Sequence, residues 1–87
     1  MTTITATAPT IHQYGSLSRI GAGKENLDGS FTFEQEFNNH EEAKDYLREK
    51  LDAFWLSSSM TQEEREELQA QIDEGYLVID AVTAYIE

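Results

Sequence analysis

The sequence NHEEAKDYLREKLDAFWL, residues 39–56, predicts the amphipathic helix around which the fold is organised. Its apolar residues follow one another at the spacing that places them along one face of a helix. They are Ala43, Tyr46, Leu47, Leu51, Phe54 and Trp55. Asn39 is placed to cap the first turn, and Glu42 completes a pair that resembles a capping box. Burying each large side chain contributes roughly 1.5–3 kcal/mol, so we expect the strands to pack on this helix.

The length and composition limit the classes of protein to consider. Eighty-seven residues predict a single domain, residues 1–87, with one core and no deep catalytic cleft. The chain has no cysteine, which excludes disulfides and thiolate zinc sites and is typical of a reducing cytosol. No stretch approaches the roughly 20 apolar residues of a membrane span, and residues 1–10 lack the features of a signal peptide. We expect a soluble, cytoplasmic protein.

The charge is large and unevenly distributed. Seventeen acidic and six basic residues give a net charge of −11. Residues 1–33 are neutral overall, so the whole excess lies in residues 34–87. This charge exceeds the magnitude of roughly 2–8 that keeps a small domain soluble. Such a field repels nucleic acid and anionic membranes and attracts basic protein surfaces. The alternative is an acidic surface that only interacts with solvent.

The first part of the chain predicts strands joined by a glycine-rich loop. Residues 1–10 predict a frayed terminus or an edge strand, because Pro9 cannot donate to a ladder. Residues 11–20 alternate loosely and predict a strand, and residues 21–29 predict its connecting loop. Residues 30–37 are the clearest strand, with phenylalanines on one face and glutamates on the other. The sheet is therefore expected to be antiparallel and covered on one side.

A second, shorter helix is predicted for residues 61–74, after a break at residues 57–59. Thr61 and Glu64 have the spacing of a capping box, and Gly75 stands where a left-handed residue ends a helix. The apolar seam of this helix is thin and consists of Leu68 and Ile72, with Ala70 beside them. We expect this helix to dock shallowly and to expose most of its surface.

Residues 76–86 are rich in β-branched and aromatic residues and predict one long final strand. Both of its faces are partly apolar, which favours a central position with a kink or bulge at Asp80. The predicted fold class is therefore α+β. It consists of a small antiparallel sheet of about three strands with two helices on one face, in the order β-β-α-α-β.

The residues that could carry catalytic or metal chemistry do not form a specific pattern. Gly21 to Lys24 resemble part of a phosphate-binding loop, but the preceding glycine and the following Ser or Thr are missing. His12 and His40 are far apart and neither has a histidine partner at helical spacing. The carboxylates lie on predicted solvent faces, where a raised pKa is not expected. The sequence predicts no enzyme, no cofactor and no metal site.

Acidic residues on the two predicted helices are the candidate partner-binding residues. They are Glu63, Glu64, Glu66, Glu67, Asp73 and Glu74 on the second helix, and Glu41, Asp45, Glu49 and Asp52 on the first. Carboxylates at helical spacing lie roughly 5–6 Å apart, which is comparable to the spacing of phosphates along a nucleic-acid strand. Asp73 and Glu74 also lie at the negative end of the helix dipole, so stability does not explain their presence.

The whole chain resembles the small phage-encoded inhibitors of bacterial defence of the anti-CRISPR kind. The resemblance is carried by its size, the absence of cysteine, the acidic helix at residues 61–74 and the run SFTFEQEFNNHEEAKDYL. These inhibitors share no common motif or fold, so no functional residue is transferred. The resemblance implies stoichiometric binding to a nuclease or surveillance complex in the host cytoplasm, by occlusion of its nucleic-acid path.

Two functions remain open at this point. In the first, the acidic helical face mimics nucleic acid and binds a basic surface of a CRISPR-Cas-like complex, without direct contact to nucleic acid or membrane. In the second, the protein is a structural or adaptor module that pairs through a sheet edge or through aromatic anchors, for example as a homodimer. Trp55, Tyr14 and Tyr85 are the candidate anchors, because Trp and Tyr are frequent interface hot spots. Trp55 can equally belong to the core.

Overall fold

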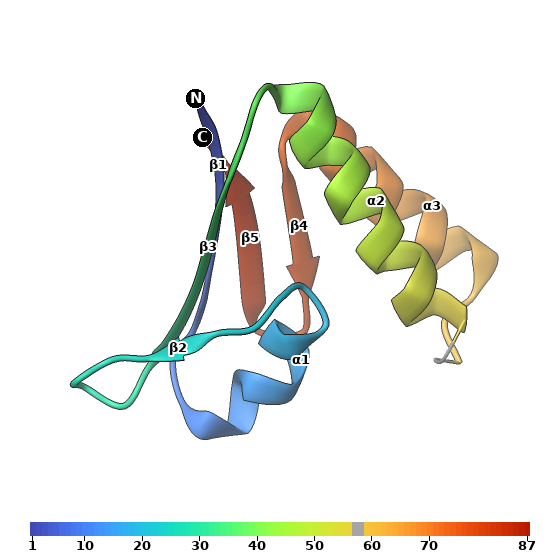
Figure 1. The fold of residues 1–87 in the computed structure, drawn as a ribbon. Coiled ribbons are helices and arrows are strands. Elements are labelled where there is room, and N and C mark those ends of the chain that lie inside the picture. The colour runs from blue at the N-terminus through green and yellow to red at the C-terminus, as the bar shows by residue number, and fades with distance from the viewer. Residues whose placement is uncertain (57–58) are drawn as a thin grey trace.

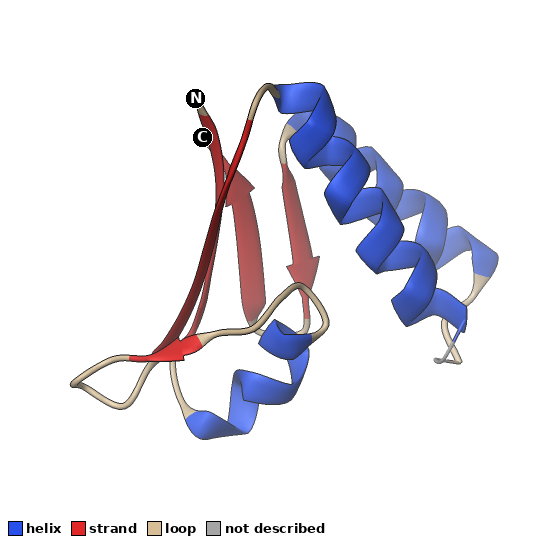
Figure 2. Ribbon diagram, in the orientation of Figure 1, coloured by secondary structure: helices blue, strands red, loops and turns tan. Residues whose placement is uncertain are grey.

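The computed structural model describes residues 1–56 and 59–87. It is an α+β fold in which helices cover one face of an antiparallel sheet of five strands (Figures 1 and 2). The strands are β1 (Thr2–Ala8), β2 (Lys24–Glu25), β3 (Phe31–Phe37), β4 (Tyr76–Ile79) and β5 (Val82–Ile86), and their order across the sheet is β2-β3-β1-β5-β4. The helices are η1 (Ile11–Gln13, a 3-10 helix), α1 (Tyr14–Ser18), α2 (His40–Leu56) and α3 (Gln62–Glu74). The predicted break at residues 57–59 lies partly outside the described residues.

Helix α2 forms as the sequence predicts. The backbone N–H of Glu42 donates to the Asn39 side chain at 2.9 Å, and the Glu42 carboxylate accepts from the backbone N–H of Asn38 at 3.2 Å. The first bond satisfies a donor that the first turn leaves free, and the second ties the residue before the cap to the helix. The fully buried residues of α2 are Ala43, Leu47 and Leu51. The apolar spacing therefore correctly identified the face that packs on the sheet.

Strand β3 carries its phenylalanines towards α2 and its glutamates towards solvent, as expected. The rings of Phe33 and Phe37 have centroids 6.1 Å and 5.2 Å from that of Tyr46 on α2. Glu34 and Glu36 are exposed on the opposite face of the sheet. In Figure 1 the two long helices lie on one side of the sheet and the other side is bare. The prediction of a sheet covered on one side is confirmed.

The prediction for residues 1–10 is wrong, because β1 is the central strand. It pairs with β3 on one side and β5 on the other, and Ile4, Ala6 and Ala8 are buried on the helix side. Pro9 follows the last strand residue, so it removes no donor from the ladder. Thr3, Thr5 and Thr7 alternate with the buried residues and lie on the bare face, whereas Thr2 is buried on the helix side. Such alternation is what a central strand in a sheet covered on one side requires.

Residues 11–18 are helical and residues 19–20 form a turn, so the strand predicted for residues 11–20 is also wrong. Thr10 caps η1 by accepting a hydrogen bond from the backbone N–H of His12, and α1 follows directly. Leu17 and Ile20 are both fully buried. Alternation places these two residues on opposite sides of a strand, whereas a spacing of three places them on the same side of a helical turn.

The strand that pairs with the outer side of β3 lies inside the predicted glycine loop. It is β2, which pairs Lys24 with Thr32 and Glu25 with Phe31. The tight connection that follows is held by Asp28, whose carboxylate accepts hydrogen bonds from the backbone N–H and the hydroxyl of Ser30 at 3.0 Å and 2.6 Å. These bonds lower the pKa of Asp28. The hairpin is therefore much shorter than expected.

Residues 76–86 form a hairpin rather than one long strand. Ile79 pairs with Val82, so the chain reverses at Asp80, which has a positive φ of 52°. Aspartate tolerates this conformation better than most residues. The two-residue turn shifts the alternation by one position, so Leu77 and Ile79 share the buried face with Val82 and Ala84. This shift explains why both faces of a continuous strand looked apolar.

Helix α3 begins and ends at the predicted caps. The Thr61 hydroxyl accepts from the backbone N–H of Glu64 at 3.2 Å, and Gly75 ends the helix in the left-handed region at a φ of 102°. Ile72 is the fully buried residue of α3, and Leu68 is partly buried. The helix docks shallowly beside β4, and most of its polar residues face solvent.

Candidate partner-binding surface

The predicted acidic residues fall into two groups, because α2 and α3 lie side by side (Figure 1). Between the two helices, Arg48 bridges Asp45 at 2.8 Å and Asp73 at 3.0 Å. Arg65 pairs with Asp52 across the same contact. We call these five residues the α2–α3 seam. Three of the ten candidate acids therefore already have an arginine partner within the protein.

The seam explains features that the sequence left open. Asp73 lies at the unfavourable end of the dipole of α3, but its hydrogen bond to Arg48 offsets that placement and raises the pKa of Arg48. The Arg65 guanidinium also lies 4.7 Å from the ring centroid of Trp55. This cation–π contact places Trp55 between the helices, where it is partly buried.

The remaining acids of α3 form no salt bridge within residues 1–56 and 59–87. Glu63, Glu67 and Glu74 are separated by one and by two helical turns, which places them in a row along one side of the helix. We call these three residues the outer row. All three are exposed, and within residues 1–56 and 59–87 the structure contains no salt bridge to any of them. Glu66 is exposed beside the row and accepts a hydrogen bond from Gln62 at 3.4 Å.

The acids of α2 outside the seam are exposed as well. Glu41 lies in the first turn, where the positive end of the helix dipole favours a carboxylate. Glu49 lies near Tyr46. The pKa of Tyr46 is raised mainly by its own burial and further by the charge of Glu49. The row predicted on α2 is thus divided, because Asp45 and Asp52 belong to the seam whereas Glu41 and Glu49 do not.

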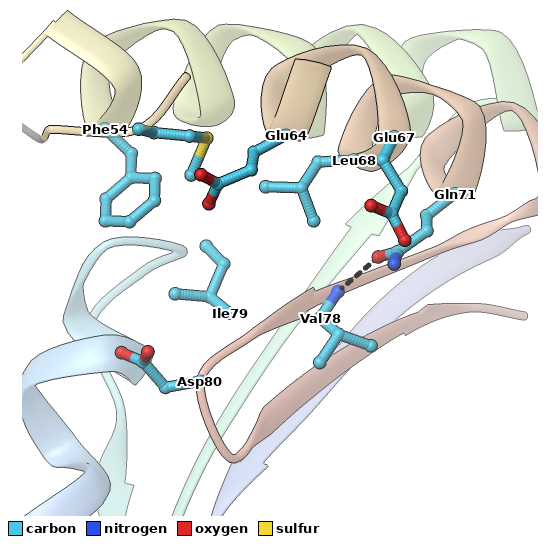
Figure 3. Close-up of a pocket in the computed structure, with 9 residues that line it drawn as sticks. Phe54, Glu64, Glu67, Leu68, Gln71, Val78, Ile79 and Asp80 are labelled. Carbon is cyan, nitrogen blue, oxygen red and sulfur yellow. Dashed lines mark hydrogen bonds between the residues drawn. The ribbon is translucent and has the colours of Figure 1, made fainter. Parts of the chain in front are cut away.

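A hollow of about 260 Å³ lies between α3 and the β4–β5 hairpin (Figure 3). Its apolar lining consists of Phe54, Met60, Leu68, Val78 and Ile79, and its polar lining of Glu64, Glu67, Gln71 and Asp80. Figure 3 shows Glu64 and Glu67 reaching from α3 over the apolar residues, with Asp80 at the opposite rim. The volume is below the roughly 300–1,000 Å³ of sites for drug-sized ligands. We call this hollow the α3 pocket.

Sequence reasoning missed the α3 pocket and the place of Asp80 in it. Asp80 is held at the hairpin turn, where its carboxylate accepts a hydrogen bond from the Ser16 hydroxyl at 2.6 Å. The spacing of Glu64, Glu67 and Gln71 on one side of the helix was a usable signal. The other side of the pocket, formed by Val78, Ile79 and Asp80, could not be predicted, because residues 76–86 were predicted to form a single strand.

The candidate aromatic anchors differ in exposure. Tyr14 packs on the Phe31 ring, with centroids 4.7 Å apart, and contacts the core. Trp55 is partly buried beside Arg65. Tyr85 is 56% exposed and lies opposite Tyr76 on the bare face of the sheet. Of the three predicted anchors, Tyr85 alone has more than half of its surface open to solvent.

The described residues contain neither a metal-binding cluster nor a membrane-spanning helix. No group of three or more histidine, cysteine or acidic residues is arranged to hold a metal ion there. His40 instead lies with its Nδ1 3.2 Å from the Thr2 hydroxyl, and His12 stands in η1. None of the helices in this part of the chain combines the length and the apolar character needed to cross a membrane.

Comparison of the chain with profiles of protein families, with curated protein sequences and with solved structures finds no match.

Proposed function

We propose that this protein is a non-enzymatic inhibitor that binds a basic, nucleic-acid-binding surface of another protein through the outer side of α3. The observation that carries the proposal is the division of the acids. Arg48 and Arg65 are held in the α2–α3 seam, so they leave the charge of the outer row uncompensated. An uncompensated row of carboxylates attracts a basic groove and competes there with phosphates.

The distribution of charge over the whole molecule supports the same partner. The net charge of −11 favours rapid, salt-sensitive association with a basic surface and disfavours direct contact with nucleic acid. Helical spacing sets neighbouring carboxylates of α3 roughly 5–6 Å apart. A surface of this kind fits a groove that normally holds a nucleic-acid backbone, as in the complexes that anti-CRISPR inhibitors block.

The α3 pocket adds an apolar contribution next to the outer row. A partner arginine or lysine can place its aliphatic stem against Leu68 and Ile79 while its charged end meets Glu64 or Glu67. Long basic side chains are amphipathic, so they suit a hollow with an apolar floor and a carboxylate rim. This contact gives the surface an attachment point besides long-range charge.

A competition experiment tests the proposal. The protein is titrated into CRISPR effector complexes of several types that carry labelled target DNA, at low and at moderate salt. We expect at least one complex to lose DNA at near-equal stoichiometry, with a weaker effect at higher salt.

Two variants with equal charge separate the acidic helix from the remaining surface. Glu63→Gln with Glu67→Gln and Glu74→Gln neutralises the outer row, whereas Glu25→Gln with Glu49→Gln and Glu87→Gln removes three exposed charges outside α3. We expect only the first variant to lose inhibition. Equal loss in both variants, or inhibition that salt does not change, contradicts the proposal.

A further inference from the structure

The two edges of the sheet differ in how their backbone groups are used. At the β4 edge, the backbone N–H of Val78 donates to the Gln71 side chain of α3 at 3.0 Å. Helix α3 lies alongside β4 and covers this edge. At the other edge, β2 is only two residues long and pairs with Phe31 and Thr32 of β3. The rest of β3 extends past the end of β2.

The hydrogen-bond pattern identifies which groups of β3 this leaves open. The N–H of Asn26 donates to the C=O of Ser30 at 2.7 Å, on the side of β3 where β2 lies. Since an antiparallel strand presents alternate residues to each neighbour, Thr32, Glu34 and Glu36 also direct their backbone groups to that side. Beyond Thr32 no strand pairs there, and no turn or loop backbone of residues 1–56 or 59–87 bonds to Glu34 or Glu36.

The side chains along this edge define what can dock there. The carboxylates of Glu34 and Glu36 are exposed on the bare face of the sheet. On the helix face of the same edge, Phe37 is only partly buried against Tyr46. A neighbouring strand therefore meets negative charge on one face and an aromatic ring on the other. Opposite charges at facing positions of neighbouring strands stabilise the pairing.

A second copy of this chain does not suit the edge. Antiparallel pairing of two copies centred on Gln35 places Glu34 of one copy opposite Glu36 of the other. Like charges at facing positions are unfavourable. Charge complementarity instead selects a strand with basic residues on the bare face.

We propose that residues 34–37 of β3 are a docking edge, which accepts an extended segment of a basic protein by strand addition. The segment places Lys or Arg opposite Glu34 and Glu36, with an apolar residue between them. This site lies at the opposite edge of the sheet from α3 and the outer row. It therefore does not depend on the proposed function of that helix.

Hydrogen exchange of the free protein tests the first step. We expect the amides of Glu34 and Glu36 to exchange much faster than those of Phe33, Gln35 and Phe37, which face β1. Slow exchange at both glutamates in the free protein means that the edge is already paired, and overturns the proposal.

A synthetic peptide tests the docking itself. The probe is the acetylated and amidated peptide Thr-Lys-Val-Lys-Val-Lys-Thr, titrated to millimolar concentration into isotope-labelled protein. We expect chemical-shift changes centred on residues 34–37 and slowed exchange at Glu34 and Glu36. Controls are the same peptide with glutamate for lysine and one with N-methylated backbone amides. We expect both to bind at least about fivefold more weakly.

A protein variant supplies an independent check. Glu36→Pro removes an N–H that has no partner in the free fold, so the thermal midpoint is expected to change little while peptide binding falls at least about fivefold. If the proline variant does not fold, the N-methylated peptide with the unmodified protein decides the question. Shifts confined to α3 overturn the docking edge but leave the proposed function intact. Absence of shifts at residues 34–37 overturns the docking edge in either case.

Discussion

Where α2 and α3 face each other, acidic residues are paired with arginines, whereas on the outer side of α3 they are not. Asp52 and Asp73 contact Arg65 and Arg48 at the seam. The three glutamates of the outer row are also exposed but have no such partner in the described part of the chain. The number of acids on a helix therefore does not measure the charge that the helix offers to a partner. Arginines positioned by a neighbouring helix decide which acids remain available.

The largest expected effect comes from neutralising the outer row. Glu63→Gln with Glu67→Gln and Glu74→Gln is expected to weaken binding of a labelled hexa-arginine peptide at least about tenfold at low salt, because three favourable charge contacts are lost. Fluorescence anisotropy measures the affinity, and urea unfolding is expected to show an unchanged or higher stability. The matched control is Glu25→Gln with Glu49→Gln and Glu87→Gln, which are exposed acids outside α3. Comparable weakening in that variant argues for nonspecific charge attraction.

Breaking the seam is expected to affect stability rather than binding. Arg65→Met removes the contacts with Asp52 and with the Trp55 ring, and is expected to lower the free energy of unfolding by about 1–2 kcal/mol. Urea denaturation followed by Trp55 fluorescence measures the change. Asp52→Asn is the matched partial variant. It keeps the stacking of Arg65 on the Trp55 ring, so it is expected to lower the free energy of unfolding by less. An equal cost for both variants means that the cation–π contact contributes nothing.

The inner side of α2 gives a pH-dependent prediction. The Tyr46 hydroxyl donates to the Ile20 carbonyl at 2.6 Å, and its pKa is raised from 10.0 by burial and then by the charge of Glu49. Because the folded state holds this proton more tightly than the unfolded state, stability is retained below pH 10 and falls as the pH rises above that value. Tyr46→Phe is expected to cost about 1 kcal/mol at neutral pH and to weaken this alkaline loss. An unchanged alkaline profile in the variant contradicts the assignment to Tyr46.

The smallest effect is expected at the exposed end of the seam. Asp45 pairs with Arg48 one turn away on the same helix, and the Asp45 side chain is 73% exposed. Asp45→Asn is therefore expected to change the free energy of unfolding by only about 0.3–0.5 kcal/mol. Thermal unfolding at low and high salt measures this difference. A loss above about 1 kcal/mol shows that the three-residue bridge acts cooperatively.

The parts of the fold predicted correctly are those in which one local pattern dominates. Residues 39–56 and 61–74 combine helical spacing with caps, and residues 30–37 have a clean alternation that ends in a helix cap. The errors arise where the same residues are compatible with two secondary structures. Residues 11–20 fit a strand by alternation and a helix by the spacing of Leu17 and Ile20. The spacing alone does not show which of these two conformations packs against the core.

The candidate surface was predicted in composition but not in organisation. The acids of both helices were identified and are exposed, but pairing across the seam depends on how α2 and α3 lie against each other. Asp80 illustrates the same limit. The sequence predicted a kink or bulge at Asp80, whereas the residue lies in a hairpin turn. Its position opposite Glu64 at the α3 pocket therefore could not be predicted.

The central position of β1 also has a consequence for the folding rate. This strand begins the sheet in sequence, yet Thr5 pairs with Glu34 on one side and with Tyr85 on the other. Both pairings close long loops, and loop closure is slow when contacts are far apart in sequence. We therefore expect refolding in milliseconds to seconds rather than microseconds. Before β5 pairs with β1, one edge of β1 is exposed. The partly folded sheet is therefore the state most prone to aggregation.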